Sequence, residues 1–322
     1  MGTHKELDSL KLQLVKDFLL NKNKLSSYVI QGFPTHIITS TLNYDDDDDD
    51  EMNILILNLG PLLSNLKFKC SIEKQILVFI WYMANCETHR QIANRFNLSD
   101  STSHGVVINC LEQINTLSRD FIQWPSGQKA IETVEKFNSL RETFFPNGIV
   151  NADQIFIDVF AGWPGSSHDA RVFRKSTIGQ NILENHGSLL FPNCHILGDG
   201  AYPLTENVMV PYKDNGHLTQ SQKNFNKILS SSRVVVEQTF GKLIGRFRKL
   251  KHMDVYHKSY CGKIITAACC LHNICMTTGD DFDSEPFVSE MEIVGGIHEN
   301  GTRSGILKRD AICNALLLQD HF

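Results

Sequence analysis

The chain has 322 residues, of which 42% are apolar and 21% charged; this permits one large core or two ordinary ones and excludes a disordered polyelectrolyte, a collagen and a coiled coil. Its formal net charge is −5, so the molecule as a whole is not a basic nucleic-acid-binding protein, and any such function needs a local patch. The nine cysteines are scattered without a C-x-x-C pair, which argues against a disulfide scaffold or a zinc ribbon and suits a reducing compartment.

The first segment, residues 1–51, combines an amphipathic stretch with an unbroken acidic run. The run extends from Asp45 to Asp50 and continues with Glu51, so its like charges resist packing. We expect a solvated linker there, although the pattern also fits an interaction segment. The longest apolar run of the chain, 76–84, is too short to span a bilayer, and no secretory signal is evident. These features predict a soluble intracellular protein without membrane contact.

The second segment, residues 52–143, has the periodicity of helices. Apolar residues recur every three or four positions, and Ser99 fits the N-cap of a helix that follows a short turn. The stretch 87–102 therefore predicts a helix, a turn and a second helix, the first burying Ile92, Ala93 and Phe96.

Small polar residues stand at the start of the second of these helices. We expect Ser101, Thr102, Ser103 and His104 to be exposed there, where Ser101 and Thr102 could contact DNA bases or phosphates as in a helix-turn-helix protein. An ordinary helical hairpin in a bundle explains the same pattern equally well.

The third segment, residues 144–277, alternates short β-branched or aromatic runs with helical patterns. Strands are predicted at 155–160, 195–197 and 208–211, and helices at 233–250 and 263–276, after a last helix of the second segment at 127–143. This alternation is typical of an α/β domain with partly parallel strand pairing. The tail, residues 278–322, is acidic at first, and we expect it to be peripheral.

Three acidic residues in this part of the chain could bind a divalent cation: Asp169, Asp199 and Glu237. Asp199 follows an apolar strand, at the end where α/β folds place their sites. Carboxylates gathered from a strand end and a helix supply the oxygen ligands that Mg²⁺ requires. Two such ions can activate water and stabilise the leaving oxygen in an attack on a phosphodiester.

The surroundings of Glu237 suggest that it needs a partner. It follows three valines, and we expect its helical neighbours Val234 and Phe240 to face the core. A carboxylate beside a buried face is costly unless it is paired or bound to a cation. In the alternative without a metal, Asp199 caps a turn and Glu237 pairs with Arg233.

A basic stripe continues the helix that carries Glu237. Between residues 233 and 263, eight lysines and arginines stand against two acids, and such a stripe could bind a phosphate backbone. A solvated helix face is the alternative. The candidate DNA-binding residues of this stripe are Lys242, Arg246, Arg248, Lys249 and Lys251. His272, in an apolar helix, is predicted to be a hydrogen-bonded core histidine.

Four motifs in order resemble the DDE superfamily endonuclease domain of PIF/Harbinger transposases and, more closely, the Harbinger transposase-derived nucleases. The motifs are WPGSSHDARVF (163–173), LGDGAYPL (197–204), RVVVEQTFGKLIGRFRKL (233–250) and CCLHNI (269–274). The similarity covers roughly residues 75–275. It implies an RNase H-like core, Mg²⁺- or Mn²⁺-dependent hydrolysis of DNA phosphodiesters, and Asp169, Asp199 and Glu237 as catalytic metal ligands. It also implies DNA and a separate Myb/SANT-like DNA-binding protein as partners, in the nucleus or also in the cytoplasm.

The chain departs from the family pattern between Val150 and Asn151. About 40 residues that would include the first catalytic aspartate are absent, a piece comparable to a βαβ unit. Neither Asp153 nor Asp158 stands in an equivalent motif. We therefore expect a nuclease core that lacks its first strands, and the chain's own activity is in question. A catalytically inactive DNA- or protein-binding module is the alternative.

Overall fold

The computed structural model describes residues 70–133, 148–162, 169–184, 190, 194–255, 257, 259–278 and 301–319, Asp169 by its backbone only. The predicted N-terminal helix, the acidic run and most of the predicted 127–143 helix lie outside these residues. None of the helices within them is long and apolar enough to cross a membrane.

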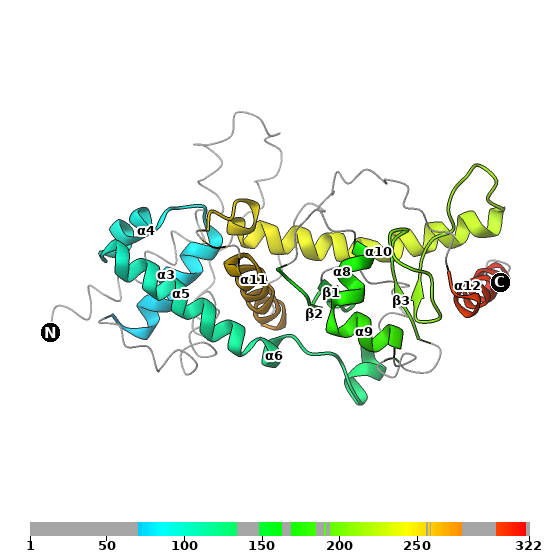
Figure 1. Cartoon of the computed structure of the whole chain (residues 1–322), viewed down its shortest axis with the longest axis horizontal. Coiled ribbons are helices and arrows are strands. Elements are labelled where there is room, and N and C mark those ends of the chain that lie inside the picture. The colour runs from blue at the N-terminus through cyan, green and yellow to red at the C-terminus, as the bar shows by residue number, and fades with distance from the viewer. Residues whose placement is uncertain are drawn as a thin grey trace, which may run out of the picture.

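A unit of short helices forms one end of the molecule (Figure 1). It consists of α3 (Ile72–Ala84), α4 (His89–Phe96), α5 (Asp100–Thr116) and the single turn α6 (Ser118–Phe121). The first three pack on one another, because each has an apolar side that is buried. The predicted helix, turn and helix over 87–102 are confirmed as secondary structure.

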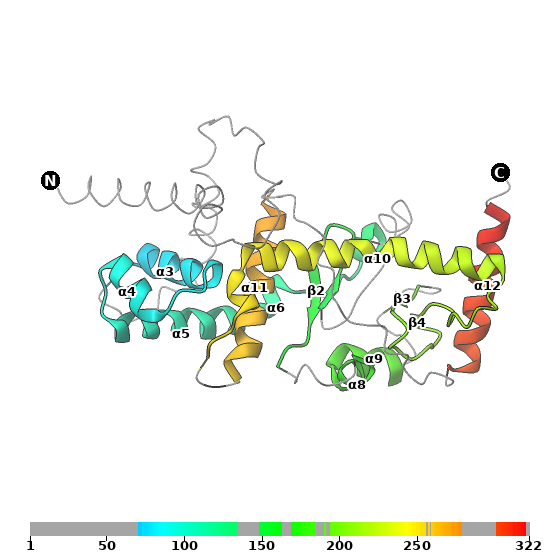
Figure 2. The ribbon, with the colours of Figure 1, turned by 90° about the horizontal axis from the view of Figure 1, so that it is seen from above.

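The long helix α10 (Gln220–Arg246) runs along the molecule and is crossed near its two ends by α11 (Ser259–Thr277) and α12 (Arg303–Gln319) (Figure 2). It begins well before the predicted 233–250 helix, at a capping box formed by Thr219 and Gln222. It also ends earlier than predicted, and the basic residues 248–251 form a 3₁₀ turn, η2.

Two separate two-stranded sheets lie between α10 and the helices α8 (Asp169–Lys175) and α9 (Thr177–Glu184), as Figure 2 shows. The antiparallel pair is β1 (Gly148–Val150) with β2 (Phe156–Val159), and the parallel pair is β3 (Ile196–Leu197) with β4 (Val208–Met209). The fold is thus mixed helix and strand with partly parallel pairing, as predicted, but β1 was not predicted. Within the described residues no sheet has more than two strands.

Asn273 of α11 closes one backbone position of β2 in the way that a neighbouring strand would. Its side-chain amide donates to the Phe156 carbonyl at 2.7 Å and accepts from the Phe156 N–H at 2.8 Å. A further bond to the carbonyl of Phe121, at 2.9 Å, ties the end of the helical unit to the same point. The side chain is buried, so these bonds satisfy groups that water cannot reach.

The C-terminal helix α12 is an integral part of the fold, which corrects the expectation that the tail is peripheral. Gly305 lies so close to Thr205 that a Cβ at this position would come within 2.7 Å of its backbone. Lys308 donates to the carbonyls of Cys194 and Glu206. A second small core then forms between α12, α10 and the segment before it, with the buried members Tyr212, Phe225, Leu229 and Cys313.

We predict that Asn273→Ala lowers the free energy of unfolding by roughly 3 kcal/mol. The substitution leaves a buried N–H and two buried carbonyls without these bonds, and each such group costs about 1–3 kcal/mol. Urea unfolding measures the change. Asn94→Ala, at an exposed position of α4, is the control, and an equal effect of both substitutions would contradict the role given to Asn273.

Candidate functional site

Asp199 lies in the loop that follows β3, as predicted. Its Oδ1 accepts a hydrogen bond of 2.7 Å from the N–H of Ala201, and its carbonyl accepts from Tyr202. The buried ring of Tyr202 packs closely against Gly198, where a Cβ would lie 3.2 Å from its Cγ. Asp199 therefore caps a fixed turn and remains half-buried.

Glu237 lies in the middle of α10, half-buried beside the apolar side of the helix. Val235 and Val236 are buried, whereas Val234 is 37% exposed, so the expectation that Val234 faces the core is wrong. Phe240 does face the core, with its ring 5.6 Å from that of Phe156. The difference follows from the phase of the helix, which only the packing of α10 on the strands sets.

Arg233 connects the two acids. It lies one helical turn before Glu237, the spacing at which opposite charges on a helix interact. Burial lowers the pKa of its guanidinium, and the nearby charges of Asp199 and Glu237 raise it in opposition. One arginine thus interacts with both carboxylates, which shows that the fold brings Asp199 and Glu237 to the same region.

The third predicted ligand, Asp169, is the first residue of α8, and its side chain lies outside the described part of the structure. Among the described side chains, no group of three histidines, cysteines or acids is placed to hold a metal ion. Asp199 and Glu237 offer oxygen donors that suit a hard cation, but two carboxylates beside an arginine do not complete a site.

Asp158 on β2 is a further carboxylate in an unusual environment. It is not among the site residues predicted from the sequence. Burial raises the pKa of its carboxyl to about 6. The sequence signal was its position inside the apolar run 155–160, where an acid interrupts a buried strand. Such a group is a candidate functional residue, because shifted carboxylates gather at sites.

The predicted basic stripe is not a continuous exposed surface. Lys242 and Lys249 are buried, at 7% and 4% exposure, which corrects the expectation for these two. Lys249 lies over the ring of Tyr82 at 4.7 Å, and Arg246 approaches His272 of α11. These cations hold helices together. Of the five candidates, Lys251 is exposed and Arg248 is half-buried.

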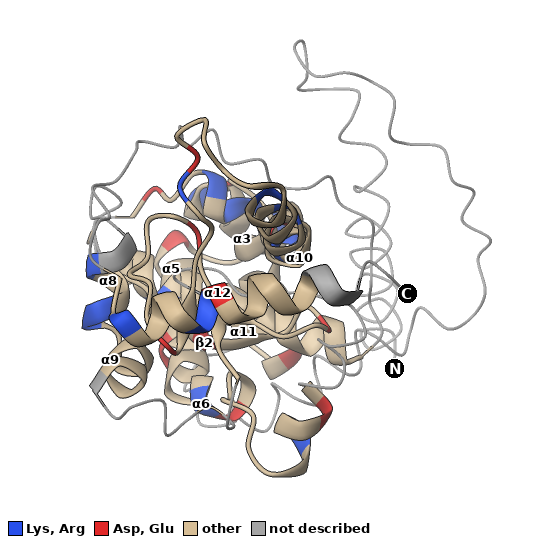
Figure 3. Cartoon of the chain, turned by 90° about the vertical axis from the view of Figure 1, so that its right-hand side faces the viewer, with Lys and Arg blue, Asp and Glu red and all other residues tan. Residues whose placement is uncertain are grey.

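A different basic surface lies on α8, and sequence reasoning missed it. Arg171, Arg174 and Lys175 are all exposed, and Figure 3 shows the blue segments of this helix at the surface. They directly follow Asp169 in the chain. The sequence signal was the repeated basic residue in DARVFRK, which overlaps the end of the WPGSSHDARVF motif.

The turn between α4 and α5 is tightly specified. Asn97 ends α4 in the left-handed conformation, with φ 49° and ψ 58°, and Ser99 caps α5 through its bond to the Thr102 N–H. Ser101 and Thr102 also lie within hydrogen-bond distance of the Ser99 hydroxyl, so both serve the cap. Ser103 is fully buried, which corrects the expectation of its exposure.

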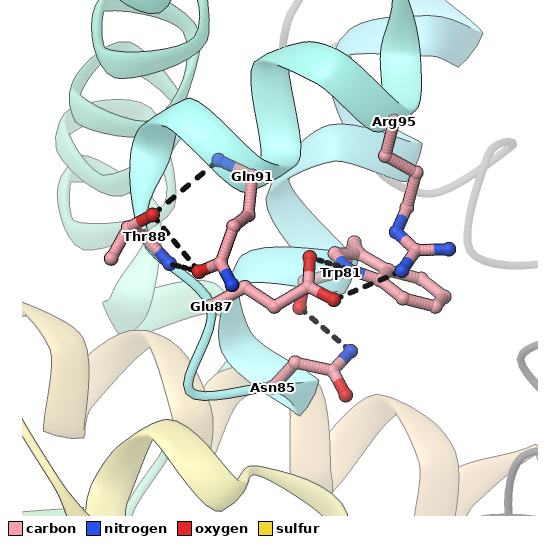
Figure 4. A network of polar contacts seen from close by, with 6 residues as sticks. All are labelled: Trp81, Asn85, Glu87, Thr88, Gln91 and Arg95. Atoms are coloured by element: carbon pink, nitrogen blue, oxygen red, sulfur yellow. Dashed lines mark hydrogen bonds and ion pairs between the residues drawn. The ribbon is translucent and has the colours of Figure 1, made fainter.

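A polar network fixes α4 against α3 (Figure 4). The carboxylate of Glu87 accepts from Trp81 Nε1 at 2.8 Å and from Arg95 at 3.0 Å. The Arg95 guanidinium also lies over the Trp81 ring, 4.2 Å from its centroid. Thr88 and Gln91 form a reciprocal capping box at the start of α4. The mutual orientation of these helices is therefore held by charge-assisted bonds as well as by apolar packing.

Residues 136–273 match the family described as DDE superfamily endonuclease. Among the described residues, this segment contains the four strands, α8, α9 and α10, and both Asp199 and Glu237. The predicted resemblance to the DDE superfamily endonucleases is therefore confirmed for this segment. No solved structure matches the chain significantly.

The curated relatives extend this similarity beyond the domain. The chain is 24% identical over 330 residues to the human protein named "Putative nuclease HARBI1", covering 90% of this chain and 86% of that protein. The mouse protein of the same name is 24% identical over 364 residues, covering 99% and 95%. "Protein ALP1-like" of Arabidopsis thaliana is 27% identical over 158 residues, covering 45% of this chain and 38% of that protein. The similarity supports a nuclease-like function.

The alignment with the mouse protein is longer than this chain. It runs over 364 positions, although this chain has 322 residues, so at least 42 aligned positions have no residue in this chain. In total number, these positions are close to the segment of about 40 residues expected to be absent after Val150.

We predict that Glu87→Gln weakens the attachment of α4 to α3. The neutral amide replaces the charge-assisted bond to Arg95, so we expect a loss of about 1–2 kcal/mol in the free energy of unfolding. Urea unfolding followed by tryptophan fluorescence is the measurement. The matched control is Glu132→Gln at an exposed position, and a loss no larger than that of the control would contradict the prediction.

Proposed function

We propose that this chain is a divalent-metal-dependent DNA endonuclease of Harbinger transposase origin whose own rate of phosphodiester hydrolysis is low. The observation that carries this proposal is that the charges of Asp199 and Glu237 both act on Arg233, inside a segment that matches the DDE superfamily endonucleases. The similarity to proteins named as nucleases over most of the chain supports it.

Asp199 and Glu237 would hold the cation, and Asp169 would be the third carboxylate. The turn around Asp199 fixes one of its oxygens against the Ala201 N–H. Glu237 comes from the middle of α10, whose apolar side is buried against its neighbours. When bound, Mg²⁺ or Mn²⁺ supplies an activated water and charge neutralisation at the scissile phosphate. Arg233 would balance the acids when no cation is present.

The low rate follows from the carboxylate set and from the sheets. In an RNase H-like core, central strands would bring acids from neighbouring strands together. The described residues instead form two separate strand pairs. A first aspartate from the absent segment would be missing from this arrangement. With fewer carboxylates the cation is bound more weakly and water is less well placed.

A cleavage assay on supercoiled DNA with Mg²⁺ or Mn²⁺ tests this function. We expect slow nicking that is abolished by Asp199→Asn or Glu237→Gln. We also expect a rate at least about tenfold higher in a version that receives the additional segment of the mouse relative after Val150. Equal activity of both versions would contradict the proposed effect of the gap.

Metal binding is measured separately by thermal unfolding. If the carboxylates still form a site, Mn²⁺ at a hundred times its dissociation constant stabilises the protein by about 2.7 kcal/mol. Glu237→Gln should remove the shift, whereas Glu132→Gln at an exposed position should leave it unchanged. Absence of a shift at millimolar Mn²⁺, together with absence of nicking, would favour the inactive binding module.

A second function, DNA binding without cleavage, is favoured by the exposed cations of α8 and the locked turn between α4 and α5. Arg171, Arg174 and Lys175 would contact phosphates next to Asp169, and Arg248 and Lys251 of η2 would make separate phosphate contacts. Ser101 and Thr102 would lie near DNA at the start of α5, in a helix-turn-helix arrangement. We propose a nuclear setting and a separate Myb/SANT-like partner, as the family resemblance implies.

The salt dependence of DNA affinity tests the α8 surface. Neutralising Arg171, Arg174 and Lys175 to glutamine should reduce the slope of log K against log salt by about 0.9 for each phosphate that the variant no longer neutralises. A control with the same charge change replaces the exposed Lys213, Lys223 and Lys227. An unchanged slope in the α8 variant, or an equal reduction in the control, would contradict the assignment.

A further inference from the structure

A cluster of aromatic and basic side chains joins the helical unit to the endonuclease domain. Tyr82 of α3 stacks on His89 of α4, with ring centroids 5.4 Å apart and an interplanar angle of 11°. His89 in turn meets His104 of α5 edge to face at 4.9 Å. From the endonuclease side, Lys249 of η2 places its Nζ 4.7 Å from the centre of the Tyr82 ring.

This cluster is part of the interface between the two regions. Lys249 is 4% exposed although it is a lysine, so η2 buries a charge against α3 to form the interface. The neighbouring Arg248 carbonyl accepts a bond from the Cys86 thiol at 3.4 Å, just before α4. At the other end of the interface, Lys263 of α11 pairs with Glu112 of α5, and its carbonyl accepts from Asn115.

The charges around His89 oppose its protonation. It is the first residue of α4, where the positive end of the helix dipole disfavours another positive charge. His104 and Lys249 add repulsion from α5 and η2, and Asp100 at the start of α5 is the acid among the described residues that acts in the opposite direction. Tyr82, the remaining neighbour, is neutral, because burial raises the pKa of its hydroxyl to about 12.

We propose that the Tyr82–His89–Lys249 cluster is a pH-sensitive joint, which holds the helical unit firmly on the endonuclease domain when His89 is neutral and loosens when it is protonated. A proton on His89 places a second cation beside the same ring that Lys249 occupies. Because Lys249 is buried there, water and salt screen this repulsion only weakly. The repulsion therefore loosens the packing of η2 against α3. The proposal does not depend on nuclease activity.

The direction of the pH effect follows from the position of His89. Burial is the main cause that lowers its pKa below the ordinary value of 6.5 in the folded state. A histidine whose pKa is lower in the folded state than in the unfolded state contributes its full stability at pH values above its unfolded pKa. This contribution is lost as the pH falls below about 6.5. Mild acid should therefore loosen the joint, whereas neutral pH should tighten it.

Thermal unfolding of the full chain between about pH 7.5 and 5.5 tests the joint. His89→Phe keeps a ring on Tyr82 but cannot be protonated, so its melting temperature should fall by about 2–4 °C less over this range than that of the natural chain. His217→Phe, at an exposed loop position, is the matched control and should retain the full dependence. Equal pH dependence in His89→Phe and the natural chain would overturn the proposal.

A second measurement, made on the natural chain, tests the joint even if the variant folds poorly. The histidine ring signals in NMR spectra, with that of His89 identified by its absence in His89→Phe, should titrate below pH 6.5. Amide hydrogen exchange, corrected for its intrinsic pH dependence, should then increase in η2 and at the end of α3 as His89 becomes protonated. Titration of His89 at or above its ordinary value, or exchange that is unchanged in these segments, would refute the joint.

Discussion

The apolar side of α10 is the constraint on which the rest of the structure depends. It is buried along most of the helix, from Phe225 through Val235 and Val236 to Leu243. Each such side chain contributes about 1.5–3 kcal/mol by its removal from water. The strands, α11 and α12 pack on this one helix, and the phase that burial imposes on it sets where Arg233 and Glu237 lie.

The burial of cations is the second general feature. The chain has an excess of acids, yet several of its lysines and arginines are drawn into the packing between helices, such as Lys249 on Tyr82. A buried cation needs a ring or an acceptor nearby, so each of these interactions fixes an orientation as well as an energy. The cations that remain exposed, above all those of α8, are the ones available to a phosphate backbone.

The small sheets show how short strand pairs can satisfy their backbone. Strands need partners for their N–H and C=O groups, and a pair of strands alone leaves an edge. The side chain of Asn273 provides one such partner for β2, at a point where α11 and the end of α6 also meet. A helix side chain thus does locally what a further strand would otherwise do. The acids of the domain then depend on α10 and on the loop after β3, and less on a broad sheet.

The sequence alone determined the helices of the first unit, the Ser99 cap, strands β2, β3 and β4, the core position of His272 and the endonuclease resemblance. The elements and the cap rest on propensity, capping or periodicity, which act over a few neighbouring residues, whereas the resemblance rests on four motifs. Only the tertiary structure decided the docking of α12 through Gly305 and the burial of Ser103, Lys242 and Lys249. These features depend on residues far away in the chain: Lys249 is buried because Tyr82 lies opposite it. Local patterns predict which segments are regular, but burial is decided by which distant surfaces meet.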